Sequence, residues 1–205
     1  MSTLLLLSSY ASAAPHSKTI LVLGDSLSAE YGLQRGTGWV ALLEKRLQDK
    51  KMDTKVLNAS ISGETSSGGL TRLPALLQQH HPDIVIIELG GNDALRGFNL
   101  DASEKNFREM IRLSKQNKAR VLLTGMRIPP NYGKPYSDRF FAMYGKIAHD
   151  TNSALLPFLL EGRADQPELF QGDRIHLIAQ AHPRILDNVW APLQNLLNQT
   201  RSAQP

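Results

Sequence analysis

The sequence predicts an α/β fold of three layers, in which helices cover both faces of a five-stranded, doubly wound parallel sheet of the flavodoxin-like type. Two observations lead to this prediction. Short runs nearly continuous in Val, Ile and Leu are typical of strands that are buried on both faces of a parallel sheet. Longer amphipathic segments separate these runs, and a helix is the compact crossover between parallel strands.

The expected strands are, in chain order, "TILVLG" (19–24), "KVLNA" (55–59), "DIVIIELG" (83–90), "RVLLTG" (120–125) and "ALLPF" (154–158). Apolar residues at helical spacing predict the segments between them. The three clearest stripes are Trp39, Leu42, Leu43 and Leu47; Leu70, Leu73, Leu76 and Leu77; and Phe107, Met110, Ile111 and Ser114. Further helices are expected at about 137–150 and 178–198, the second of which carries Ile185, Val189, Leu193 and Leu196.

Length and composition predict a single globular domain over residues 15–205. A chain of 205 residues can bury roughly 70% of its unfolded surface in one core. Cysteine is absent, which excludes disulfides, thiolate catalysis and Cys-type zinc sites. The net charge of +4 is modest, and Lys and Arg form no run of five, so nucleic-acid binding is not expected.

The N-terminal segment, residues 1–14, resembles a truncated secretory signal peptide. The stretch "LLLLSSYASAAP" is apolar at first and then offers Ala11-Ser12-Ala13 as a small-x-small cleavage site. No Lys or Arg precedes Lys18, so the basic start of such a signal is missing, and a plain N-terminal tail is the alternative. We expect a periplasmic or secreted protein without stable membrane insertion, because no stretch of 18 consecutive apolar residues is present.

Four loops are expected to meet at one edge of the sheet. In a doubly wound fold the loops at the carboxyl ends of the strands surround the ligand crevice. This rule places "GDSLS" (24–28), "SISGETS" (60–66), "GGNDALRG" (90–97) and "RIPPNYG" (127–133) around one opening. The residues in these loops therefore decide which chemistry the protein can perform.

Ser26 in "GDSLS" is either a turn residue or a nucleophile at the end of a strand. The chain has none of the G-x-S-x-G, S-x-x-K, H-E-x-x-H or P-loop motifs, so a nucleophilic Ser26 needs another base. His176 has Asp173 three residues earlier, a spacing that lets the carboxylate accept from Nδ1 and leaves Nε2 free to face a hydroxyl. The alternative is that Asp173 caps a helix and His176 lies on the surface.

Acyl transfer also needs donors for an oxyanion, and three groups in these loops are suitable. They are the backbone N–H of Ser26, the backbone N–H of Gly63, which a missing Cβ leaves accessible, and the side-chain amide of Asn92. Read singly, Gly63 can serve only a positive φ angle and Asn92 only a turn cap.

Together, Ser26, Gly63, Asn92 and the pair Asp173 and His176 make the chain resemble the SGNH hydrolases, also called GDSL esterases, from about residue 19 to 197. "NASISGETSSGGLTRLPALL", "VIIELGGNDALRGF" and "IPPNYG" resemble more specifically the bacterial periplasmic members with acyl-CoA thioesterase, lysophospholipase and arylesterase activity. The resemblance implies that Ser26 is the nucleophile, His176 the general base and Asp173 the group that orients it. It also implies an oxyanion hole formed by Ser26, Gly63 and Asn92.

Two residues depart from the family pattern. Its last block usually reads Asp-Gly-Ile-His-Pro, whereas this chain has "DRIHL", with Arg174 and Leu177 in place of Gly and Pro. We expect Arg174 to add charge beside the catalytic pair and to remove freedom for a positive φ, and Leu177 to leave the backbone after His176 less constrained. Neither change removes a catalytic group.

The resemblance also implies an acyl-binding wall formed by Ile128, Pro129, Pro130 and Tyr132, although a rigid crossover without ligand contact is the alternative. We expect a monomeric serine esterase that hydrolyses aryl esters, acyl-CoA-type thioesters and lysophospholipids through an acyl-Ser26 intermediate, with no cofactor and no metal. One alternative is an O-deacetylase for carbohydrates or small molecules on the same fold. A more distant one is a noncatalytic flavodoxin-like binding module for a phosphate, which the acidic Asp25 in the first loop disfavours.

Overall fold

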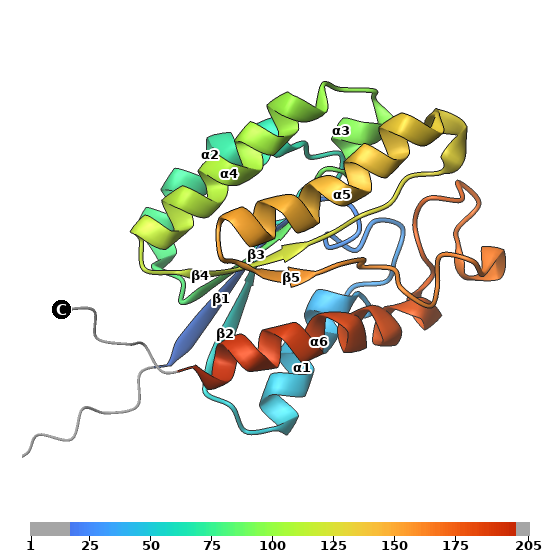
Figure 1. Ribbon diagram of the computed structural model, residues 1–205. Coiled ribbons are helices and arrows are strands. Elements are labelled where there is room, and N and C mark those ends of the chain that lie inside the picture. Colours follow the sequence, from blue (N-terminus) through green and yellow to red (C-terminus); the bar gives the residue numbers. More distant parts are fainter. Residues whose placement is uncertain (1–16, 200–205) are drawn as a thin grey trace, which may run out of the picture.

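The computed structural model describes residues 17–199, apart from the side chain of Pro130, so the expected leader at 1–14 lies outside the described residues. Its sheet has five parallel strands in the order β2-β1-β3-β4-β5 (Figure 1). The strands are β1 (Lys18–Gly24), β2 (Thr54–Asn58), β3 (Ile84–Glu88), β4 (Arg120–Thr124) and β5 (Ala154–Leu156). This order is that of the flavodoxin-like doubly wound fold, which confirms the predicted fold class.

Helices cover both faces of the sheet. Helices α1 (Trp39–Asp49) and α6 (His182–Asn198) lie on one face, and α2 (Ser66–His80), α4 (Leu100–Gln116) and α5 (Lys134–Asp150) lie on the other (Figure 1). The expected helix at 178–198 begins only at His182, because Ala179–Ala181 forms a separate 3-10 turn before Pro183 occupies the first helical turn. Within residues 17–199 no helix combines the length and the apolar character needed to cross a membrane.

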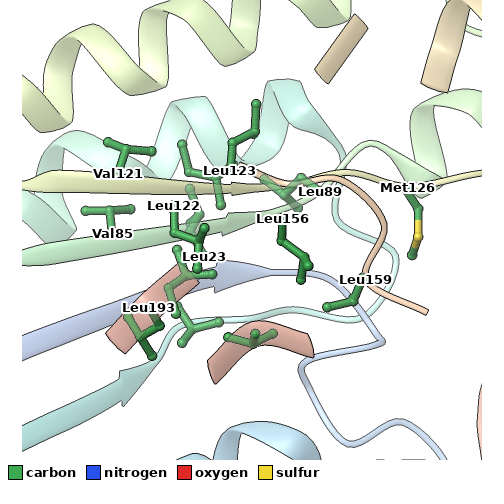
Figure 2. Packing of buried hydrophobic residues seen from close by; sticks show 14 of the residues in the cluster. Leu23, Val85, Leu89, Val121, Leu122, Leu123, Met126, Leu156, Leu159 and Leu193 are labelled. Atoms are coloured by element: carbon green, nitrogen blue, oxygen red, sulfur yellow. The ribbon is translucent and has the colours of Figure 1, made fainter. Parts of the chain in front are cut away.

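The core lies between the sheet and its two helical layers. Every residue of β3 is buried, as expected for a central strand of a parallel sheet. The register places Leu23 of β1 and Val85 of β3 on one face of the sheet and Leu122 of β4 on the other, and buried side chains fill both layers (Figure 2). This packing fixes the strands whose carboxyl ends carry the loops described next.

The carboxyl ends of β1 and β3 lie where the strand order reverses. The chain leaves β1 toward β2 on one side and later returns to β3 on the other, with Gly24 paired in register with Glu88. Such a switch point is where doubly wound folds open a crevice. A short helix after β3, α3 (Gly91–Leu95), was not expected from the sequence. It follows Gly90, whose φ of 102° and close approach to the Tyr144 hydroxyl exclude a side chain at this turn.

Candidate active site

Ser26, His176 and Asp173 form a continuous chain of hydrogen bonds. His176 Nε2 lies 2.7 Å from Ser26 Oγ, and His176 Nδ1 lies 2.6 Å from Asp173 Oδ2. The two ring nitrogens therefore face a hydroxyl and a carboxylate, which is the geometry of a serine nucleophile with a base and an orienting acid. The structure brings together three residues that are up to 150 positions apart in sequence.

Ser26 lies in a tight turn that starts directly after β1. Ser28 and Ala29 both donate their N–H groups to the carbonyl of Asp25, at 3.2 and 2.9 Å. The Asp25 carboxylate accepts the N–H of Leu27 at 3.0 Å and so closes the same turn. The regular helix α1 begins only at Trp39, so Ser26 is held by this turn and not by a helix N-terminus.

Asp173 serves two purposes in the loop that carries His176. Its Oδ1 accepts the backbone N–H groups of Ile175 and His176, at 2.9 and 3.0 Å, while Oδ2 faces the imidazole. No helix begins at Asp173, so the helix-capping alternative is wrong, and the carboxylate instead closes a turn while it also orients the imidazole. Partial burial raises the pKa of Asp173, but these two N–H groups and the His176 ring outweigh it and hold the pKa at about 2.

The three expected oxyanion donors lie around the same opening. Gly63 follows β2 with a φ of 80°, which a residue with a Cβ would adopt only with strain. Within the described residues, the N–H groups of Ser26 and Gly63 donate to no protein acceptor, and both residues line the cavity described below. Asn92 lies in α3 and donates from Nδ2 to Asp25 Oδ2 at 3.0 Å. The two backbone donors are therefore free at the cavity, and the Asn92 amide is held beside it by Asp25.

A pair of buried carboxyl groups lies beneath Ser26. Asp25 and Glu88 are each only 2% exposed. Burial raises the pKa of Asp25 to about 6, although hydrogen bonds from Leu27 and Asn92 lower it in part. Burial, together with the nearby charge of Asp25, raises the pKa of Glu88 well above its usual value. At neutral pH the negative charge of the pair therefore lies mainly on Asp25.

A cavity of about 700 Å³ opens beside Ser26 and His176. A volume of this size is typical of sites for small organic ligands. Ile128 and Pro129 line it, whereas Tyr132, in the 3-10 turn Pro130–Tyr132, is 38% exposed and does not. The side chain of Pro130 is not among the described ones. The predicted acyl wall is therefore placed at the cavity only for its first two residues.

Several apolar cavity residues escaped the sequence analysis, namely Leu27, Tyr31, Leu95, Met126, Phe158, Leu160 and Phe170. The ring of Tyr31 lies 4.4 Å from that of His176, centroid to centroid. Tyr31 and Phe170 belong to irregular segments without a periodic pattern, so no sequence signal distinguishes them from other loop residues. Phe158 stood in an expected strand that ends earlier, at Leu156.

The structure corrects the expectation for Arg174. This residue has a φ of 58°, so the position keeps the left-handed conformation even though arginine replaces the usual glycine. Leu177 is 1% exposed and pairs with Phe170 through an isolated antiparallel bridge, which constrains the backbone after His176 without a proline. Both substitutions are therefore accommodated without moving His176 away from Ser26 or Asp173.

Residues 17–199 contain no group of three or more His, Asp or Glu side chains arranged to hold a metal ion. A second hollow of about 380 Å³ lies between α1 and α6 and is lined by residues such as Leu42, Lys45 and Leu186. None of the candidate catalytic side chains lines it. The chemistry is thus concentrated in the cavity beside Ser26.

Known proteins are similar to this chain in both sequence and fold. A model of the GDSL-like lipase/acylhydrolase family matches residues 22–184. Over 180 residues the chain is 49% identical to a Pseudomonas aeruginosa protein named esterase TesA, covering 88% of this chain and 90% of the relative. Over 195 residues it is 46% identical to the Escherichia coli K12 protein named thioesterase 1/protease 1/lysophospholipase L1, covering 95% and 91%.

Solved structures are similar over nearly their whole length. A crystal structure of TesA superimposes with a TM-score of 0.85 at 49% identity, covering 87% of this chain and 99% of that one. The psychrotrophic esterase EstA from Pseudoalteromonas sp., in a structure inhibited by monoethylphosphonate, gives a TM-score of 0.84 at 43% identity, covering 89% and 100%. The first of these structures shares its name with the esterase from Pseudomonas aeruginosa, and the second is itself named an esterase.

Proposed function

Since this chain belongs to the GDSL-like lipase/acylhydrolase family and is a carboxylic ester hydrolase, we propose that its reaction proceeds through an acyl-enzyme on Ser26. The observation that carries the proposal is the unbroken contact from Ser26 Oγ through the His176 ring to Asp173, with distances of 2.7 and 2.6 Å. This contact joins a hydroxyl nucleophile to an imidazole base at the wall of the cavity, where an ester can reach both.

The proposed reaction has two steps. His176 Nε2 takes the proton of Ser26 Oγ while the oxygen attacks the ester or thioester carbonyl, and the same proton then passes to the departing alcohol or thiol. A water molecule next loses a proton to His176 and attacks the acyl-serine, and the proton returns to Ser26 as the carboxylic acid leaves. Asp173, whose pKa of about 2 keeps it ionised at neutral pH, orients the ring and stabilises its protonated form.

The oxyanion of each tetrahedral intermediate is proposed to bind the N–H groups of Ser26 and Gly63 and the amide of Asn92. The two backbone groups have no protein acceptor within residues 17–199, so they are available to a ligand. Donors that are already in place need no reorganisation as charge develops on the oxygen.

For the substrate we propose aryl esters, acyl thioesters and lysophospholipids with medium to long acyl chains. Two features support this proposal: the apolar lining of the cavity, and the names of the relatives, which include esterase, thioesterase and lysophospholipase. Ile128, Pro129 and Phe158 offer an apolar wall for the acyl chain. An O-deacetylase acting on short acyl groups is the second candidate.

We further propose that the protein acts as a monomer in the periplasm or outside the cell. The apolar N-terminal stretch with its small-x-small site supports the location. N-terminal sequencing of exported protein tests it, and an intact Met1 on that protein would contradict a cleaved leader.

The test of the function is hydrolysis of p-nitrophenyl esters with acyl chains of two to sixteen carbons, with a chelator present. We expect Ser26→Ala to abolish activity, Asn92→Ala to lower kcat about a hundred- to a thousandfold, and Ser67→Ala, on the outer face of α2, to leave it unchanged. Activity that survives in Ser26→Ala would refute the acyl-serine mechanism. An optimum at acetate would favour the deacetylase.

A further inference from the structure

The side-chain amide of Asn92 can adopt two orientations, related by a half-turn that exchanges its nitrogen and oxygen. Only the orientation in the structure leaves Nδ2 as the hydrogen-bond donor at this place. The two ends of a side-chain amide have nearly the same shape but opposite hydrogen-bonding character. If the carbonyl oxygen replaced Nδ2, it would repel a negatively charged oxygen. Something in the protein must therefore select the orientation, and Asp25 Oδ2, which accepts from Nδ2 at 3.0 Å, is the group in contact with it.

The Asp25 carboxylate is itself held firmly. Its Oδ1 accepts the N–H of Leu27 at 3.0 Å, which leaves Oδ2 for Asn92. Glu88 supports the same segment from below, since its Oε2 accepts the Asp25 N–H at 3.3 Å and the Ser28 hydroxyl at 2.6 Å. The indole of Trp39 donates to that hydroxyl at 3.2 Å. The Leu27 N–H therefore fixes Oδ1, and the buried network holds the backbone of the same segment, so that Oδ2 faces Asn92.

We propose that Asp25 is a positioning residue that holds the Asn92 amide with Nδ2 available to the oxyanion. This inference rests on the proposed function, because it assumes that Asn92 is an oxyanion donor. A carboxylate only accepts hydrogen bonds, so it selects the nitrogen end of the amide and rejects the oxygen end. With a pKa of about 6, Asp25 is ionised under the alkaline conditions suited to ester assays.

The decisive variant is Asp25→Asn, which keeps the shape of the side chain and removes the selection. Its Oδ1 can still accept the N–H of Leu27, but its Nδ2 then faces the Nδ2 of Asn92. Two donors in contact drive the Asn92 amide to turn over, so that Nδ2 leaves its donating position. We expect kcat for p-nitrophenyl butyrate at pH 8 to fall about 10- to 100-fold. KM should change by less than about threefold, because the contact matters mainly in the transition state.

A double-mutant cycle with Asn92→Ala separates positioning from general damage to the structure. If Asp25 acts through Asn92, Asp25→Asn should change kcat by less than about threefold in the Asn92→Ala background. Thermal unfolding at pH 8 confirms that each variant is folded. Should Asp25→Asn fail to fold, Asp25→Ala, which also removes the acceptor but adds no donor, takes its place in the same cycle.

Two results would overturn the proposal. One is a wild-type kcat in Asp25→Asn. The other is an equal loss in both backgrounds, which would make Asp25 a merely structural residue. Failure of the underlying function has a different signature, because it appears as activity that survives in Ser26→Ala or as a wild-type kcat in Asn92→Ala.

Discussion

Replacing Asp25 by asparagine removes a titratable group from beneath the nucleophile, and it is expected to change how protein stability depends on pH. Burial raises the pKa of this carboxyl from an ordinary value of 3.8 to about 6 in the folded protein. Between these two values the folded protein binds a proton that the unfolded chain has lost. The free energy of unfolding therefore falls as the pH rises through this window, and the full penalty is present above about pH 6.

The magnitude follows from the difference between the two values. At roughly 1.4 kcal/mol per pKa unit, the penalty amounts to about 3 kcal/mol. The amide that replaces the carboxyl in the variant does not titrate, and at pH 4 part of the penalty is already present. The stability of Asp25→Asn relative to wild type should therefore increase by about 2.5 kcal/mol from pH 4 to pH 8. Loss of the Asp25 charge also lowers the raised pKa of Glu88. The cost of ionising Glu88 at high pH then falls, which further stabilises the variant relative to wild type as the pH rises.

Urea unfolding of both proteins at several pH values between 4 and 8 measures this difference directly. Any cost of the amide that does not depend on pH cancels in the comparison. In thermal unfolding, the same change corresponds to a relative increase in Tm of about 5–10 °C for a domain of this size. A difference that stays constant within about 0.5 kcal/mol over this range would refute the reasoning, since it would mean that folding does not alter the pKa of Asp25.

Two further predictions concern the loops around the cavity. Arg174→Gly should leave kcat unchanged or raise it, because glycine adopts the φ of 58° without strain and no catalytic group is removed; steady-state kinetics showing a loss of more than about tenfold would contradict this. Ile128→Trp should shift the optimum of the p-nitrophenyl ester series to shorter acyl chains, because the larger side chain fills part of the apolar cavity that Ile128 lines. An unchanged optimum would place the acyl chain elsewhere.

The sequence was sufficient for the fold because the central strands β1, β3 and β4 are buried on both faces. Runs such as "DIVIIELG" and "RVLLTG" are too apolar to lie exposed to solvent, and the segments between the runs are long enough for helical crossovers. The strand ends agree with the structure to within two residues. Short elements escaped prediction, because α3 spans only five residues and depends on the tight packing of Gly90 against Tyr144, a contact that local sequence does not reveal.

In the candidate site, too, some residues could be predicted from the sequence and others could not. Ser26, Gly63 and Asn92 were predicted to meet because their loops follow parallel strands, and the family resemblance added Asp173 and His176. The structure brings Ser26, Gly63, Asn92 and His176 to one cavity, and Asp173 binds the ring of His176. The walls of that cavity were harder to predict. They are formed by side chains from irregular segments, and their position depends on how the loops fold back over the sheet. Tyr132 shows the limit, because the family resemblance implied a wall residue that the structure does not place at the cavity.

The loop that carries His176 is closed on itself. Phe170 and Leu177 pair at its base, the N–H of Gln171 donates to the carbonyl of His176 at 2.7 Å, and Asp173 binds the backbone of the two residues that precede Leu177. The proposed base and its orienting acid therefore lie in one loop whose backbone is held mainly by hydrogen bonds between its own residues. In evolution, such closure lets the residues between and after the pair vary, as Arg174 and Leu177 have, while the imidazole keeps its alignment.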